Sequence, residues 1–273
     1  MLTEHGSAAR VLAGGTDLLV RMRRGHIRAD VVVDVKGLDA LRADVVDYGA
    51  ALQIGASAVM ADIVADARVQ RRYPALVEAA NVVGSVQIRN RATLAGNICN
   101  ASPAADTAPA LLVYGAAVHL LSAAGARRIP LDEFFTGPGR TVLGGGELVA
   151  SIELPGAPQA AGAAFGRITR RRGVDLATVN LCCLVTAAGE TRFAYGAVGP
   201  RPFVVSDASG ILADPGAPAA AKDAVLAELI SHATPISDVR ADRDYREAML
   251  RVLSQRALAA ALARLGEAKG AGG

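Results

Sequence analysis

The chain has 273 residues, of which 52% are hydrophobic, and this supports one large domain or two smaller ones with a sizeable core. The formal net charge is +3, from 29 basic and 26 acidic residues, and so small an excess argues against a nucleic-acid-binding protein. No apolar stretch predicts a membrane span, and no apolar leader follows Met1. The odd set Cys99, Cys182 and Cys183 lacks C-x-x-C spacing, which favours the cytoplasm and places any iron–sulfur cluster on another chain.

The first 155 residues predict short strands that alternate with short helices. We expect strands over residues 9–13, 31–35, 51–55, 117–122, 126–130 and 147–154, helices over 18–24, 62–67, 73–83 and 107–114, and over 91–100 a strand that turns through Gly96-Asn97. The run VVVDV at 31–35 is typical of a buried strand, and Ala124-Gly125 of a hairpin turn. Either Thr16 or Asp17 is placed to cap the first of these helices.

The composition changes after Pro155. Residues 156–162 are rich in Pro, Gly and Ala, which predicts a domain boundary. Beyond this linker we expect an antiparallel sheet with strands over 164–169, 177–187 and 191–198, then helices over 218–231 and 244–265, and a disordered tail over 267–273.

Two glycine-bearing segments are the candidates for chemistry. Residues 13–17 and residues 93–97 each follow an apolar run. Glycine lets the backbone approach a ligand closely, and successive N–H groups can then form a nest for an anion. Two such nests together would suit a pyrophosphate, although each segment alone fits an ordinary turn. Neither contains G-x-G-x-x-G or a Walker A lysine, so the common dinucleotide motifs do not explain them.

A family resemblance connects these segments with three later strings. VLAGGTDLLVRMRRG (11–25) and QIRNRATLAGNICNASPAADTAPALLVYGA (87–116) resemble the two FAD-binding segments of molybdenum hydroxylase flavoproteins. The strings RITRRRGVDLATVN (167–180), FAYGAVGPRP (193–202) and PISDVRADRDYR (235–246) resemble the C-terminal domain of that family. The family includes the medium subunit of carbon monoxide dehydrogenase and the FAD domain of xanthine dehydrogenase, and the resemblance spans almost the whole chain.

The resemblance implies an α+β fold in two domains. Residues 1–155 would form an FAD-binding domain of vanillyl-alcohol-oxidase type, with the flavin between two α/β lobes. Residues 162–266 would form a small C-terminal domain of antiparallel sheet and helices. The family has a strand and a helix before its first FAD segment, so either these elements are missing here and the first lobe is shortened, or the start codon is assigned too late.

The same resemblance implies an oxidoreductase subunit that carries FAD. It would take electrons from the [2Fe–2S] clusters of a small partner subunit, while a large molybdopterin-binding subunit holds the molybdenum cofactor. It would then pass the electrons to an external acceptor, and no residue of this chain would act as an acid or base. A stand-alone FAD-dependent oxidoreductase of the same fold and a flavin-free scaffold subunit remain alternatives.

The resemblance also implies the cofactor-binding residues. Asp106 would hold polar groups of FAD, and it is equally placed to cap the helix over 107–114. Val149 would lie against the flavin ring, and it also fits a core position. Arg167 stands where the family commonly has a lysine near the flavin, and a cation there would favour the anionic reduced flavin. The segments that cradle the pyrophosphate would be Val11, Leu12, Ala13, Gly14, Gly15, Thr16, Asp17 and Leu18, and Thr93, Leu94, Ala95, Gly96 and Asn97.

Ala95 departs from the family pattern, because it takes the place of a glycine. If that position requires a positive φ, we expect a strained or reshaped loop. Among other candidates, the four histidines have no metal-ligand spacing, and His119 is interpreted as structural. Cys182 and Cys183 are interpreted as small core residues rather than as a redox pair.

Overall fold

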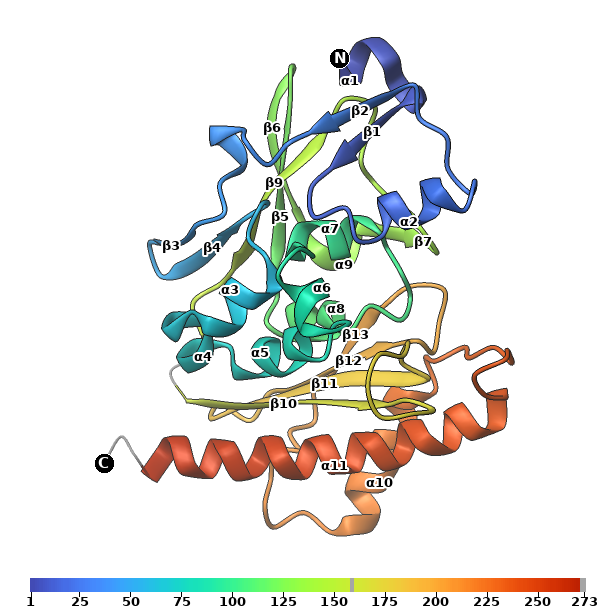
Figure 1. Ribbon diagram of the computed structural model, residues 1–273. Coiled ribbons are helices and arrows are strands. Elements are labelled where there is room, and N and C mark those ends of the chain that lie inside the picture. Colours follow the sequence, from blue (N-terminus) through green and yellow to red (C-terminus); the bar gives the residue numbers. More distant parts are fainter. Residues whose placement is uncertain (158–159, 271–273) are drawn as a thin grey trace.

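The computed structural model describes residues 1–157 and 160–270 (Figure 1). From top to bottom, Figure 1 shows a small N-terminal lobe, a larger sheet with short helices around it, and a second sheet above a long C-terminal helix. Mixed helix and sheet in this arrangement agrees with the predicted α+β class.

The N-terminal lobe contains a two-stranded parallel sheet. It is formed by β1 (Ala9–Leu12) and β2 (Val31–Asp34), after α1 (Leu2–His5) and η1 (Gly6–Ala8). Parallel neighbours need a crossover connection, and the chain between them contains α2 (Leu18–Arg23). Residues of β2 alternate between half-buried and exposed, so the prediction of a buried strand is wrong there. Successive side chains of a strand point to opposite faces, so this alternation means that one face of β2 is exposed to solvent.

The second lobe is built on a five-stranded antiparallel sheet. Its strands are β3 (Val45–Tyr48), β4 (Ala51–Gly55), β5 (Ala117–Ser122), β6 (Gly125–Pro130) and β9 (Leu148–Leu154). A separate two-stranded sheet is formed by β7 (Phe135–Gly137) and β8 (Arg140–Thr141). The helices of this lobe are η2 (Asp39–Leu41), α3 (Met60–Ala65), α4 (Ala67–Arg72), α5 (Pro74–Asn81), α6 (Val86–Arg89), α7 (Leu94–Cys99), α8 (Thr107–Val113) and α9 (Leu131–Phe134). The strand order is β3-β4-β9-β5-β6, and β5 and β6 form the predicted hairpin. Its turn residues are Ala123 and Ala124, one position before the predicted pair, because Gly125 already pairs with Ser122. The last strand of the lobe in sequence, β9, is the central strand of the sheet, because it pairs with both β4 and β5.

The C-terminal part is an antiparallel meander of four strands between two layers of helices. It comprises β10 (Ala161–Ile168), β11 (Val179–Thr186), β12 (Thr191–Gly196), β13 (Phe203–Asp207), α10 (Ala219–Ile230) and α11 (Arg243–Gly270). The helices α10 and α11 pack on this sheet, as do α5 and α8 of the preceding lobe. Every residue of β11 is buried, since both faces of the strand are covered. Cys182 belongs to the core shared with the preceding lobe and Cys183 to the core under α11, as the alternation of a strand requires.

The segment 91–100, predicted as a strand and a turn, is helical over most of its length. The helix α7 starts after Thr93, whose hydroxyl accepts a hydrogen bond from the N–H of Gly96 at 3.0 Å. Threonine is a preferred N-cap residue because its side chain satisfies one of the free N–H groups of the first turn. Gly96 and Asn97 therefore lie inside a helix, and the predicted turn at this pair is wrong.

Three further predictions need correction. Asp17 holds the N-cap position of α2 but accepts no capping bond, since its backbone is helical and not extended. The strand β13 was not expected from the sequence. The helix α11 continues to Gly270, so the disordered tail is wrong for residues 267–270, where Glu267 and Ala268 favour helix. Residues 271–273 lie outside the described residues.

Close packing of α11 on β10 depends on Gly162. A Cβ atom at this position would lie 1.9 Å from the carbonyl oxygen of Ala261 on α11. We expect Gly162→Ala to lower the free energy of unfolding by about 1–3 kcal/mol, because the helix must shift away from the sheet. Urea denaturation followed by circular dichroism measures this change. The matched control is Gly266→Ala on α11, where an added Cβ meets no atom within 4 Å. Equal stability of the two variants would contradict the packing argument.

Candidate functional site

The two glycine-bearing segments lie against each other. The loop after β1 runs toward α7 in Figure 1, and a Cβ atom added to Gly14 would lie 2.0 Å from the carbonyl oxygen of Arg91. The same atom would lie 3.1 Å from the Cα of Ala92. Only glycine permits this approach of backbone to backbone. The fold therefore brings residues 13–17 next to the entry of α7, as two facing nests would require.

The first segment presents free backbone donors. Among residues 1–157 and 160–270, no hydrogen bond has the N–H of Gly14, Gly15, Thr16 or Asp17 as its donor. Gly15 has a φ of 74°, which favours glycine, and the loop is half-buried except for the exposed Asp17. Half-buried N–H groups without partners cost free energy unless water or a ligand accepts their hydrogen bonds. Four consecutive donors in one turn form a site suited to an anion.

The second segment is more deeply buried than the first. Thr93, Leu94 and Ala95 are buried, and the N–H groups of Thr93 and Ala95 donate no hydrogen bond within the described residues. Ala95 is helical and has no positive φ, so the expected strain at this alanine is absent. The Oδ1 of Asn97 accepts a hydrogen bond from the hydroxyl of Thr107 at 2.7 Å, which ties α7 to α8.

The buried Asp106 and the half-buried Arg167 form an ion pair between the two parts of the chain. The Nη1 of Arg167 donates to Oδ2 of Asp106 at 2.8 Å, and the Nδ2 of Asn180 donates to Oδ1 at 3.0 Å. Asp106 accepts no capping bond from α8, so the interpretation of its carboxylate as a helix cap is wrong. Arg167 also donates to the carbonyl oxygen of Val82, at the end of α5. Sequence reasoning missed Asn180, although it ends a string that resembles the family.

Burial dominates the electrostatics of Asp106. Removal of its carboxylate from water raises the pKa of Asp106, and Arg167 and Asn180 offset only part of that increase. The carboxylate is therefore held by its two partners in a site that would otherwise favour the protonated form.

The remaining predicted site residues differ in how far they are buried. Val149 is buried on β9 within the hydrophobic core, opposite Leu120 of β5. The sequence allowed two interpretations of Val149, a core residue or a contact of the flavin ring, and the structure places it in the core. Val11 is exposed, while Leu12 and Leu18 are half-buried. Contact of these residues with a cofactor stays a prediction.

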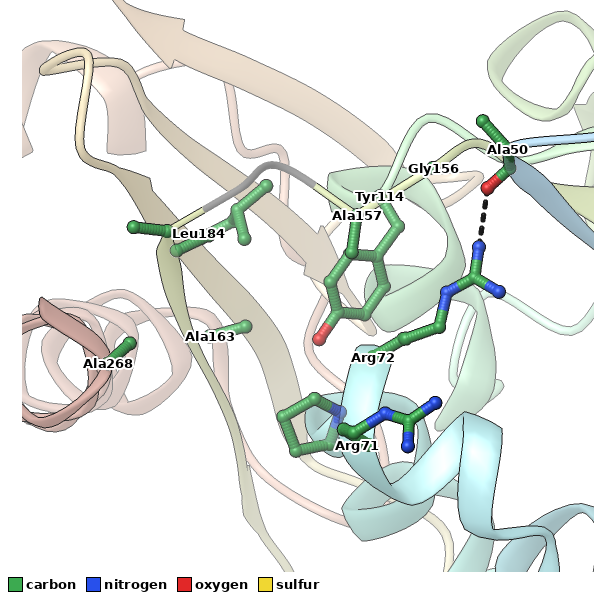
Figure 2. Close-up of a pocket in the computed structure, with 12 residues that line it drawn as sticks. Ala50, Arg71, Arg72, Tyr114, Gly156, Ala157, Ala163, Leu184 and Ala268 are labelled. Carbon is green, nitrogen blue, oxygen red and sulfur yellow. Dashed lines mark hydrogen bonds between the residues drawn. The ribbon is translucent and has the colours of Figure 1, made fainter. Parts of the chain in front are cut away.

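Two hollows lie apart from the glycine segments. One has a volume of about 440 Å³, and Figure 2 shows Arg71, Arg72 and Tyr114 around it, with Arg72 bonded to the carbonyl oxygen of Ala50. The other, of about 560 Å³, is an open groove between α5, β10 and α11 that includes Arg167 and Arg256. No residue of 13–17 or 93–97 lines either hollow, so the free donors of the loop belong to neither.

Other polar side chains have structural partners. His119 on β5 lies with Nε2 at 2.7 Å from Oε2 of Glu153 on β9, so it has a structural partner within the sheet. Cys99, Cys182 and Cys183 are free thiols. Within the described residues, no group of three or more His, Cys, Asp or Glu side chains is arranged to hold a metal ion. In the same part of the chain, no helix combines the length and apolar character that crossing a membrane requires.

Comparisons with known families match two consecutive parts of the chain. Residues 1–157 match the family described as FAD binding domain in molybdopterin dehydrogenase. Residues 164–261 match the CO dehydrogenase flavoprotein C-terminal domain.

Individual relatives cover nearly the whole length. The carbon monoxide dehydrogenase medium chain of Hydrogenophaga pseudoflava is 32% identical over 269 residues, 97% of this chain and 93% of that protein. The xanthine dehydrogenase FAD-binding subunit of Escherichia coli O157:H7 is 29% identical over 263 residues, 94% and 90% of the two chains. A solved structure of the Hydrogenophaga carbon monoxide dehydrogenase superposes with a TM-score of 0.88 at 31% identity, covering 96% of this chain and 92% of that one. For quinoline 2-oxidoreductase from Pseudomonas putida 86 the TM-score is 0.84 at 26% identity, covering 98% and 93%.

Removal of Arg167 should make stability more dependent on pH. Without this cation the pKa of Asp106 rises further above its unfolded-state value. A raised folded-state pKa contributes stability that is present below the unfolded-state pKa and is lost as pH rises through the folded-state pKa. We therefore expect Arg167→Met to lose stability from about pH 4 toward neutral pH more steeply than the wild type.

Urea denaturation at a series of pH values measures this slope. The control is Arg256→Met, because Arg256 is exposed and lines the same groove. A slope for Arg167→Met equal to that of the wild type would refute the assignment of Asp106 as the responsive group.

The thiols should be inert in the native protein. Burial raises the pKa of Cys99 to about 12, so its thiolate fraction at pH 8 is on the order of one in ten thousand. Burial also raises the pKa of Cys182 and of Cys183. We expect the buried pair Cys182 and Cys183 not to react with a disulfide reagent at pH 8 in the native state, and the half-buried Cys99 to react slowly if at all, whereas all three thiols should react in urea. Rapid reaction of the native vicinal pair would instead support a redox function.

Proposed function

The chain belongs to the FAD-binding flavoprotein subunits of molybdenum-containing dehydrogenases, and from this premise we propose how its residues hold FAD and deliver electrons. The diphosphate of FAD would bind between the loop 13–17 and the segment 93–97. The observation that carries this proposal is the row of four free N–H donors in a loop whose Gly14 packs against the backbone at the entry of α7.

The residues of the two segments fit a diphosphate. Each of its two phosphates needs donors, and the free N–H groups of Gly14 to Asp17 are supplemented by those of Thr93 and Ala95. Glycine at 14 lets this loop pack directly against the second segment, and glycine at 15 permits the positive φ of the turn. A pyrophosphate would thus satisfy donors that the protein leaves without partners. Val11, Leu12 and Leu18 would flank it.

Asp106, Val149 and Arg167 would contact the rest of the cofactor. The carboxylate of Asp106 would accept hydrogen bonds from polar groups of FAD, and Val149 would offer an apolar surface to the ring. Arg167 would place positive charge beside the flavin, with Asp106 as its counter-ion. When bound, FAD accepts two electrons and passes them on. The protein binds the cofactor, orients it and adjusts its redox properties.

The domain division follows from the same proposal. Residues 1–155 would be the FAD domain of vanillyl-alcohol-oxidase type, and 162–266 the C-terminal domain, whose sheet packs against α5 and α8. The flavin would lie between the two lobes of the first domain.

Partner subunits are proposed from the relatives. Several relatives are named as medium chains or subunits, and one solved relative is a Cu,Mo-containing CO dehydrogenase. We therefore expect a small subunit with [2Fe–2S] clusters as electron donor and a large subunit with the molybdenum cofactor. The three free thiols are compatible with a cytoplasmic location.

Gly15 tests the binding loop. We expect Gly15→Val to reduce FAD binding at least a hundredfold, because φ at this residue is 74° and the added side chain would press on Leu12 and Leu19. Gly25→Val is the matched control, since Gly25 has a φ of 72° but has open space around it. FAD content after purification, read from the absorbance of the protein near 450 nm, and fluorescence titration measure the effect.

The outcomes separate the candidate functions. Full FAD content in Gly15→Val would refute the loop assignment. A wild-type chain that binds no FAD would favour a scaffold. Substrate oxidation by the isolated chain would favour a stand-alone oxidoreductase.

A further inference from the structure

Two strained backbone positions flank the residues that lead to Asp106. Among the described residues, positive φ outside glycine occurs at Ala101, with 45°, and at Ala197, with 62°. Ala101 directly precedes the segment 102–106, and the N–H of Ala197 donates to the carbonyl oxygen of Pro103 at 2.7 Å. Such conformations persist only where the surrounding structure holds them, and they concentrate at functional sites. The conformation of 102–106 is therefore imposed by its neighbours.

Ala197 is held in turn by a buried arginine. Arg246 on α11 is fully buried, and its Nη1 donates to the carbonyl oxygens of Ala197 at 2.9 Å and Thr178 at 2.7 Å. Its Nη2 donates to Asp238 at 2.7 Å. A charged group without exposure is retained only with such partners. The turn that contacts Pro103 is thus anchored to the long C-terminal helix.

Asn180 connects the sheet to the segment itself. Its side chain is fully buried, and Nδ2 donates to Oδ1 of Asp106 at 3.0 Å and to the carbonyl oxygen of Ala105 at 3.3 Å. Its cross-strand neighbours are Arg167 on β10 and Gly196 on β12. A Cβ atom at Gly196 would lie 2.1 Å from Oδ1 of Asn180, so glycine is what leaves room for the amide. Asn180 therefore holds both the carboxylate of Asp106 and the backbone carbonyl of Ala105 in place.

We propose that Asn180 is a positioning residue for FAD, which acts through Asp106 by holding the segment 102–106 in its binding conformation. The C-terminal domain would in this way set the affinity of a cofactor bound by the FAD domain. This inference rests on the proposed function. Without Asn180, Asp106 keeps only Arg167, and the carbonyl oxygen of Ala105 loses its donor.

A double-mutant cycle tests the inference on the full 273-residue chain. The variants are Asn180→Ala, Asp106→Asn and their combination, and the dissociation constant of FAD is measured by fluorescence titration. We expect each single change to weaken binding about tenfold, and the double variant to bind no more weakly than Asp106→Asn, because residues in one network are not additive. Unchanged affinity in Asn180→Ala would overturn the inference, as would losses that multiply in the double variant.

A second pair of variants covers the case in which Asn180→Ala does not fold. Gly196→Ala displaces the amide of Asn180 without deleting it, and we expect weaker FAD binding. Gly199→Ala is the control, since its added Cβ meets nothing closer than 3.5 Å. Equal FAD affinity of the Gly196→Ala and Gly199→Ala variants would overturn the inference.

Thr191→Val is the control for a general disturbance of the C-terminal sheet, as opposed to a specific loss of the Asn180 hydrogen bonds. Thr191 is fully buried on the same sheet, and its hydroxyl has no partner within the described residues. We expect wild-type FAD affinity in this variant, and a melting temperature of flavin-free Asn180→Ala close to that of flavin-free wild type. Loss of affinity that merely follows loss of melting temperature across all variants would overturn the inference. Absence of FAD binding by the wild type would instead refute the proposed function.

Discussion

The contact between Gly14 and the carbonyl oxygen of Arg91 is the constraint on which the candidate site depends. No residue with a Cβ atom fits there, because the added atom would overlap the backbone of the facing segment. The contact joins the N-terminal lobe to the entry of α7. It also leaves four N–H groups of the loop without protein partners, at a place where two segments of backbone meet. The proposed diphosphate site would therefore depend on backbone packing more than on particular side chains.

A second constraint is the buried charge at Asp106. Its carboxylate lies where burial favours the protonated form, and two side chains from neighbouring strands hold it. Because Arg167 and Asn180 belong to the C-terminal sheet, the geometry of Asp106 depends on how the two parts of the chain pack. The packing of β10 on α5 and of β11 on α8 is therefore also part of the candidate site.

The C-terminal sheet has two functions in this arrangement. One face completes the core of the FAD-binding part, and the other is covered by α10 and α11. Glycine at 162 lets α11 approach closely, and Arg246 links that helix to the turn at Ala197. Small residues and one buried cation thus connect the outermost helix of the molecule to the segment that ends in Asp106.

The sequence by itself determined the family, the hairpin of β5 and β6, and the two glycine segments, because periodicity, turn residues and motif strings are local properties of the chain. It did not reveal that residues 94–99 are a helix, because Thr93 can cap a helix or end a strand and local propensity does not decide between them. Only the tertiary structure decided that Asp106 binds Arg167 and Asn180 and does not cap α8. These partners lie 61 and 74 positions away in sequence. Which of several possible partners a buried carboxylate takes is fixed by the packing of the domains, and no local pattern contains that information.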